Sequence, residues 1–162
     1  MPTHTVISDW VVIDAPQRCV WDILLDFDNY PQWNSFTTEV HTDLQIDSPV
    51  VLHVHLPKRG KRIQHEYVRA VQPPHTLAWG TTMGAEFLLR ALRTQTIEPI
   101  TAEQCRYRST DQLNGALTPL VKWLFANSMR TGFNNMAHEL KQRAEAHHQK
   151  NNDRKPIEGV VV

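Results

Sequence analysis

Residues 12–34 read VIDAPQRCVWDILLDFDNYPQWN, which predicts the end of a strand, a turn, a short amphipathic helix and an aromatic-rich corner. Pro16 suits the first position of the helix, where a missing N–H group costs nothing. Apolar residues at helical spacing form one face of this helix: Val20, Ile23, Leu24 and Phe27. The helix should end at Asp26, because the residues from there to Pro31 favour turns.

The middle of the chain alternates apolar and other residues as a strand does. In residues 49–57, PVVLHVHLP, every second residue from Val50 to Leu56 is apolar, and this period of two is typical of a half-buried strand. Seven segments are predicted as strands: residues 4–13, 36–45, 49–57, 62–72, 76–83, 88–98 and 103–113. The short turns between neighbouring segments favour an antiparallel sheet.

A long helix follows the last predicted strand. Thr118 is predicted as its cap and Pro119 as its first residue. Apolar residues recur at helical spacing from there to about His147, which predicts an amphipathic helix of some eight turns. Residues 149–162 are polar and then irregular, so we expect a mobile tail after a domain formed by residues 1–148.

Five short pieces of the chain, in this order, carry a resemblance to a known family: Ala15-Pro16, Val20-Trp21, Tyr30-Pro31-Gln32-Trp33-Asn34, Pro73-Pro74 and Leu77-Ala78-Trp79. The chain resembles the START-like superfamily, also called SRPBCC, and within it the polyketide cyclase/dehydrase and lipid-transport branch. The resemblance covers roughly residues 5 to 146. It implies an α+β helix-grip fold, in which a curled antiparallel sheet of about seven strands surrounds the C-terminal helix, with two short helices after the first strand.

A cavity is expected between such a sheet and its helix. An amphipathic helix and an antiparallel sheet must bury their apolar faces against each other. A seven-stranded sheet twists and curls, so it contacts a straight helix along part of its length and leaves space elsewhere. That space is where we expect a ligand.

Composition limits the classes of function. The formal net charge is zero at pH 7, which argues against a general nucleic-acid or anionic-membrane surface. No segment approaches the ~20 apolar residues that span a bilayer, and the N-terminus lacks the pattern of a signal peptide. Cys19 and Cys105 belong to no C-x-x-C pair, so we expect two free thiols and a soluble cytoplasmic protein.

Polar residues occupy positions on the late strands where inward-facing residues are expected. Arg93 and Gln95 are in phase with Ile97, and Ser109 and Asp111 are in phase with Leu113. A buried polar group needs a partner, so these four side chains could form a polar wall that orients a ligand. The alternatives are an ion pair between Arg93 and Asp111, or a bulge that turns the residues out to solvent. The resembled family often has bulky residues or histidine here, so roles are not carried over.

Gly132 falls at the centre of the apolar face of the long helix. It could leave room for a ligand, or it could allow close packing against a strand. Apolar and aromatic side chains are further candidates to line the cavity, with ordinary core packing as the alternative: Trp33, Phe36, Trp79, Tyr107, Phe125, Met129 and Phe133.

Histidines raise the question of a metal site. His53 and His55 lie two apart on one strand, a spacing that can chelate a metal, but zinc needs three or four ligands and the sequence brings no further ligand near them. We therefore predict no metal and no cofactor. Phosphate-binding glycine loops and nucleophile elbows are absent from the sequence.

The sequence favours a binder of a small hydrophobic molecule, such as a lipid, quinone, polyketide or aromatic compound, held in an enclosed cavity between the sheet and the C-terminal helix. An alternative is an enzyme of the cyclase or dehydratase kind, in which Asp111 or Arg93 acts as acid, base or oxyanion partner. No catalytic residue is assigned. A second alternative is a protein-interaction module, since Trp123 is expected on the polar side of the long helix, where it could anchor a homodimer or pack within its own chain.

Overall fold

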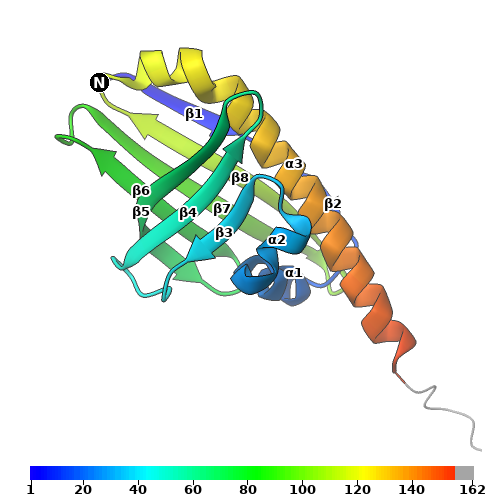
Figure 1. The fold of residues 1–162 in the computed structure, drawn as a ribbon. Helices are drawn as coiled ribbons and strands as arrows, with labels where there is room; N and C mark the ends of the chain where they lie inside the picture. The colour runs from blue at the N-terminus through cyan, green and yellow to red at the C-terminus, as the bar shows by residue number, and fades with distance from the viewer. Residues whose placement is uncertain (156–162) are drawn as a thin grey trace, which may run out of the picture.

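In the computed structural model, which describes residues 1–155, one antiparallel sheet curls around one long helix (Figure 1). The elements follow in this order: β1 (Thr3–Ile7), β2 (Val11–Ile13), α1 (Gln17–Leu25), the 3-10 helix η1 (Phe27–Asn29), α2 (Tyr30–Trp33), β3 (Thr37–His41), β4 (Pro49–Leu56), β5 (Gly60–Gln72), β6 (Thr76–Met83), β7 (Leu89–Thr101), β8 (Gln104–Asn114) and α3 (Thr118–Asp153). The α+β helix-grip fold predicted from the sequence is confirmed.

The strands lie in the order β1-β8-β7-β6-β5-β4-β3, and β2 also pairs with β8. The segment predicted as one strand, residues 4–13, is thus two strands on the same neighbour. Ser8 interrupts it, because its hydroxyl accepts a hydrogen bond from the backbone N–H of Ser109 at 2.9 Å. Asp9 is then tied to α3, where the Asn134 side chain accepts from its backbone N–H at 2.8 Å.

The opening helices close one end of the sheet. Pro16 is the N-cap of α1 rather than its first helical residue, so the helix begins one residue later than predicted; it ends at Leu25, with Asp26 as its C-cap. Three residues of the predicted apolar face, Val20, Ile23 and Leu24, are buried on α1, and so is Trp21, which was not predicted there. Phe27, the fourth, lies in η1 and is partly buried. Tyr30 is completely buried, and its hydroxyl donates to the backbone carbonyl of Leu24 at 2.5 Å, which holds α2 against α1.

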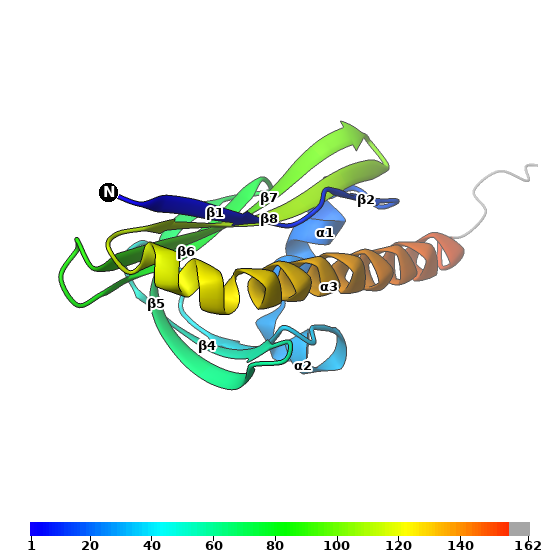
Figure 2. The ribbon, with the colours of Figure 1, turned by 90° about the horizontal axis from the view of Figure 1, so that it is seen from above.

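Helix α3 lies within the curl of the sheet, with β1, β7 and β8 on one side of it and β4 and β5 on the other (Figure 2). It begins at Thr118, which is its first helical residue rather than its cap, and it continues to Asp153 instead of ending near His147. Residues 149–153 of the predicted tail are therefore helical, and residues 156–162 lie outside the described part of the chain. Within residues 1–155, no helix combines the length and apolarity that a membrane span requires.

The second half of α3 is hydrogen-bonded to segments at both edges of the sheet. On one side, the Lys141 ammonium donates to the carbonyl of Val12 at 2.8 Å. On the other side, Glu139 accepts from the backbone N–H of Ser35 at 2.7 Å. The first half is bonded to Asp9 on the side of β1 and β2, where Arg130 donates to the carboxylate at 3.0 Å and Asn134 accepts from the backbone N–H at 2.8 Å. On the side of β4 and β5 it is held by stacking, since the guanidinium groups of Arg59 and Arg62 lie 5.6 and 4.6 Å from the centroid of the Phe125 ring.

Candidate functional site

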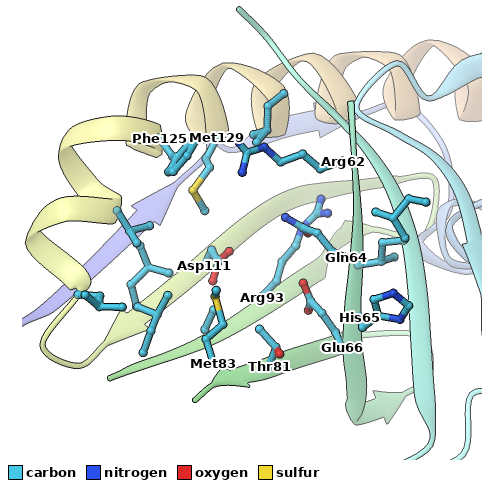
Figure 3. Close-up of a pocket in the computed structure, with 18 of the residues that line it drawn as sticks. Arg62, Gln64, His65, Glu66, Thr81, Met83, Arg93, Asp111, Phe125 and Met129 are labelled. Atoms are coloured by element: carbon cyan, nitrogen blue, oxygen red, sulfur yellow. The ribbon is translucent and has the colours of Figure 1, made fainter. Parts of the chain in front are cut away.

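A cavity of about 440 Å³ lies between the first half of α3 and the concave face of the sheet (Figure 3). Its walls are mainly apolar, with contributions from the helix and from the late strands: Val121, Phe125, Met129, Leu89, Ala91 and Leu113. The cavity opens to solvent at its rim, where Met83 and Leu120 are exposed. The space predicted between sheet and helix therefore exists, but it is an open pocket rather than an enclosed one.

Four charged side chains line this pocket from the sheet; Arg62 of β5 lies against Phe125, and the other three meet in one region. Arg93 lies on β7 and Asp111 on β8, directly opposite each other in the strand register. Glu66 comes from β5, and Figure 3 shows it extending into the same part of the pocket as Arg93. A mainly apolar cavity thus has one region where three charged side chains meet, which is the arrangement that orients a ligand in many binding sites.

Arg93 is fixed by contacts on several sides. Its side chain is 5% exposed, as the alternation of β7 predicted. The Nε group donates to Ser109 Oγ at 3.1 Å, and Nη1 donates to Thr37 Oγ1 at 3.4 Å. The guanidinium also lies over the rings of Phe36 and Phe133, 5.2 and 4.7 Å from their centroids. Such contacts hold the cation in one orientation beneath the pocket.

Asp111 is 9% exposed, and its Oδ1 atom has no hydrogen-bond partner in the described part of the chain. Burial raises the pKa of Asp111 to about 6, while the charge of Arg93 acts in the opposite direction. The two side chains form no ion pair among residues 1–155, and neither faces bulk solvent. In this part of the chain, therefore, neither alternative to an inward-facing polar wall is present: the ion pair between Arg93 and Asp111, or a bulge that turns them out to solvent.

Glu66 is a pocket residue that the sequence analysis missed. Burial raises its pKa to about 7, the negative charge of Asp111 adds to this effect, and Arg93 opposes it. Its alternation along β5 could have identified it, because Glu66 lies two residues before the fully buried Val68 and therefore on the same face of the strand. In the sheet it is also opposite the fully buried Val50 of β4. Strand β5 is polar at most other positions, so its inward face was hard to identify.

The residues proposed from the sequence as ligand-binding fall into two groups. Six of them line the pocket: Phe36, Arg93, Asp111, Phe125, Met129 and Phe133. The other six lie outside the lining: Trp33, Trp79, Gln95, Tyr107, Ser109 and Gly132. Of these, Tyr107 and Gln95 bond to each other, with the Tyr107 hydroxyl donating to Gln95 Oε1 at 2.8 Å.

Aromatic packing fills the end of the sheet near the opening helices. The Trp79 ring meets Phe27 edge to face at a centroid distance of 6.5 Å. Trp33 packs in the same way against Tyr30 at 5.0 Å. Both tryptophans therefore pack in the core, which was the alternative to lining the cavity.

Gly132 packs against a side chain rather than lining free space. A Cβ atom at this position would overlap the ring of Phe36, which itself lines the pocket. The interpretation that Gly132 leaves room for a ligand is therefore wrong, and the close-packing alternative holds, with an aromatic ring in place of a strand backbone. The glycine allows Phe36 to lie between α3 and Arg93.

Gly132→Ala should therefore lower the free energy of unfolding by about 1–3 kcal/mol, the usual cost of overpacking a core. Helix propensity alone predicts the opposite sign, a gain of about 0.5–1 kcal/mol. Urea unfolding of the parent and the variant measures the difference. Phe36→Ala, which removes the ring atoms that the new Cβ would overlap, should reduce the cost of the alanine at position 132 when the double variant is compared with Phe36→Ala alone. A Gly132→Ala protein more stable than the parent would contradict the packing argument.

The comparisons with known proteins agree with this architecture. The family described as polyketide cyclase / dehydrase and lipid transport matches residues 4–145. A START superfamily protein from Mycobacterium smegmatis is similar in structure, with a TM-score of 0.68, 18% identity, and coverage of 89% of this chain and 99% of that chain. No curated protein sequence is similar enough to this chain to count as a match.

Two further solved structures share the fold at low identity. Norcoclaurine synthase from Thalictrum flavum, in complex with dopamine and hydroxybenzaldehyde, has a TM-score of 0.67 and 14% identity, covering 90% of this chain and 88% of its own. The di-domain ARO/CYC protein BexL of the BE-7585A biosynthetic pathway has a TM-score of 0.61 and 14% identity, covering 91% of this chain and 50% of its own. At such identities the likeness concerns the fold alone.

Proposed function

Because this chain belongs to the polyketide cyclase / dehydrase and lipid transport family, we propose that it binds a small, mainly apolar molecule in the pocket beneath the first half of α3. The observation that carries the proposal is a cavity of about 440 Å³ with apolar walls and one charged region. That volume falls within the roughly 300–1,000 Å³ typical of sites for small molecules.

The charged region suggests what the ligand carries. Arg93 is already engaged by Ser109 and Thr37, whereas Asp111 Oδ1 has no hydrogen-bond partner among residues 1–155. A protonated Asp111 can donate to a carbonyl oxygen, and an ionised one can accept from a hydroxyl group. A lipid, quinone, polyketide or aromatic compound with one such oxygen near its end would satisfy both the apolar walls and the free carboxyl.

Ala91→Leu tests this proposal, because Ala91 lines the pocket from β7 and a leucine there would fill part of the cavity. We expect about tenfold weaker binding of 1-anilinonaphthalene-8-sulfonate, followed by its fluorescence, since a single misplaced methylene in an apolar pocket costs at least that much. Ala102→Leu is the matched control, because Ala102 is exposed in the turn between β7 and β8. Equal affinity in all three proteins would contradict binding in this pocket. Native mass spectrometry of gently purified protein would look for the bound molecule itself.

An enzyme is the second candidate, favoured by the two carboxyl groups whose pKa values lie near neutrality at about 6 and about 7. Groups of this kind can hold a proton and release it at physiological pH. Two structural neighbours are described as a synthase and as an ARO/CYC protein, which is compatible with such a role. Exchange of the α-hydrogens of an added aromatic ketone in D₂O, followed by NMR, separates the candidates. A binder leaves the exchange rate at its uncatalysed value, whereas an enzyme accelerates it and loses the acceleration in Asp111→Asn.

The interaction module remains a third candidate. Trp123 is 79% exposed, so it does not pack within the part of its own chain that the structure describes. A homodimer anchored by this side chain stays a prediction, as does a location in the cytoplasm. Neither is needed for binding in the pocket.

A further inference from the structure

Three potential metal ligands meet on the outer face of the sheet, away from the pocket. Glu39 and His41 lie two residues apart on β3, and His53 on β4 is directly opposite Glu39 in the strand register. His53 alternates along β4 with Leu52, which lines the pocket on the inner face. The sequence indicates no further ligand near His53, whereas the pairing of β3 with β4 brings Glu39 and His41 beside it.

The distances fit a metal site that needs only small side-chain rotations. Glu39 Oε2 and His41 Nε2 are 3.3 Å apart. The candidate ligand atoms of all three residues lie within 4.8 Å of one another. Tetrahedral zinc has bonds of about 2.0–2.2 Å, which places neighbouring ligand atoms roughly 3.3 Å apart. The pair from β3 is therefore already at ligand spacing, and His53 needs to approach by about an ångström or so.

The two imidazole rings lie next to each other, edge to face. Their centroids are 6.0 Å apart and their planes are inclined by 75°. The side chains of His41 and Glu39 are 65% and 50% exposed, so they can rotate without disturbing the core. His55, the other histidine of the predicted pair, lies opposite Lys61, whose positive charge disfavours a cation nearby.

We propose that Glu39, His41 and His53 bind a divalent transition-metal ion such as Zn²⁺. Two imidazole nitrogens and one carboxylate oxygen form a ligand set that suits zinc and its neighbours better than magnesium or calcium. The remaining coordination position faces solvent. Bound metal would join β3, the last strand at its edge of the sheet, to β4 by contacts additional to the backbone ladder.

Isothermal titration with ZnCl₂ tests the site on untagged, EDTA-treated protein. We expect one ion per chain, and a thermal unfolding midpoint that rises with ZnCl₂ concentration, because a ligand that binds only the folded state stabilises it. His41→Ala and His53→Ala should each weaken zinc binding at least about tenfold and remove the thermal shift, since each deletes one of three ligands. Unfolding of the metal-free variants should stay close to that of the metal-free parent, because His41 is exposed and His53 is only partly buried, on the outer face of the sheet.

Two control variants separate this site from other histidines. His55→Ala, on the same strand, should leave the zinc affinity unchanged. His148→Ala should do the same, although His148 lies 2.9 Å from Glu103 and could attract a metal at the far end of the molecule. The proposal is overturned if the parent binds no zinc, if His41→Ala and His53→Ala bind it as the parent does, or if either control loses as much affinity as they do.

Discussion

Arg93→Met should lower the free energy of unfolding by about 3–5 kcal/mol at pH 8, the usual cost of removing one partner from a set of buried charges. At that pH, Asp111 and Glu66 are ionised in the folded parent, with pKa values of about 6 and about 7, and Arg93 lowers both. Without the cation, each carboxyl must either remain protonated or hold an uncompensated charge. Methionine fills a similar volume, so the loss measures charge more than packing.

The pH dependence of this loss identifies its cause. At pH 4.5 Asp111 and Glu66 are both protonated in the folded protein, so neither gives Arg93 a negative charge to interact with. Arg93→Met should therefore lose much less stability at this pH than at pH 8. Urea unfolding at both pH values measures the difference. Arg90→Met, on the exposed side of the same strand, is the control and should change stability little at either pH. An equal loss at pH 4.5 and pH 8 would mean that the arginine acts through packing alone.

Asp111→Asn should have the opposite effect, raising the free energy of unfolding at pH 8 by about 2–3 kcal/mol. Burial raises the pKa of Asp111 in the folded protein from 3.8 to about 6. The folded state therefore binds the proton more tightly than the unfolded chain does, and stability falls as pH rises from about 4 to about 6. Asparagine cannot ionise, so Asp111→Asn should be more stable than the parent above pH 6, where the parent carboxyl is charged. Below pH 4, where that carboxyl is protonated, the two proteins should be equally stable.

Denaturant unfolding across this pH range should show two curves that coincide near pH 4 and separate above it. Asp28→Asn, at an exposed position of η1, should follow the parent throughout. The double variant Arg93→Met/Asp111→Asn should lose less stability at pH 8 than Arg93→Met alone, because one of the two buried charges is gone. If Asp111→Asn is instead less stable than the parent at pH 8, the folded protein must stabilise the ionised carboxylate by an interaction stronger than that with Arg93.

The fold was predictable because its signals are local. The strand alternation, the turn residues before α2 and the helical period from Pro119 onward each act over a few residues. The inward phase of Arg93 and Asp111 was equally visible, since it needs only the neighbouring positions on their own strands. The boundaries were less secure, and the break at Ser8 could not be foreseen because it depends on a backbone group of β8.

The predictions that were wrong concern contacts between residues far apart in the sequence. Whether Gly132 leaves room or removes it is decided by Phe36, which lies before β3 in the chain. Whether His53 has metal ligands beside it is decided by the register of β3 on β4. Sequence periodicity says which way a side chain points but not what it meets, so it predicts a pocket wall better than it predicts the neighbours of any one residue.

The unequal attachment of α3 has a kinetic consequence. Its second half is hydrogen-bonded to segments at both edges of the sheet, whereas the half beside the pocket is bonded to Asp9 on one side and held on the other by Arg59 and Arg62 stacked on Phe125. Stacked contacts of this kind are worth about 0.5–2 kcal/mol each, so thermal motion separates them often. A bound molecule would leave by this end, and its residence time would depend on the two arginines even though neither belongs to the charged region that orients it.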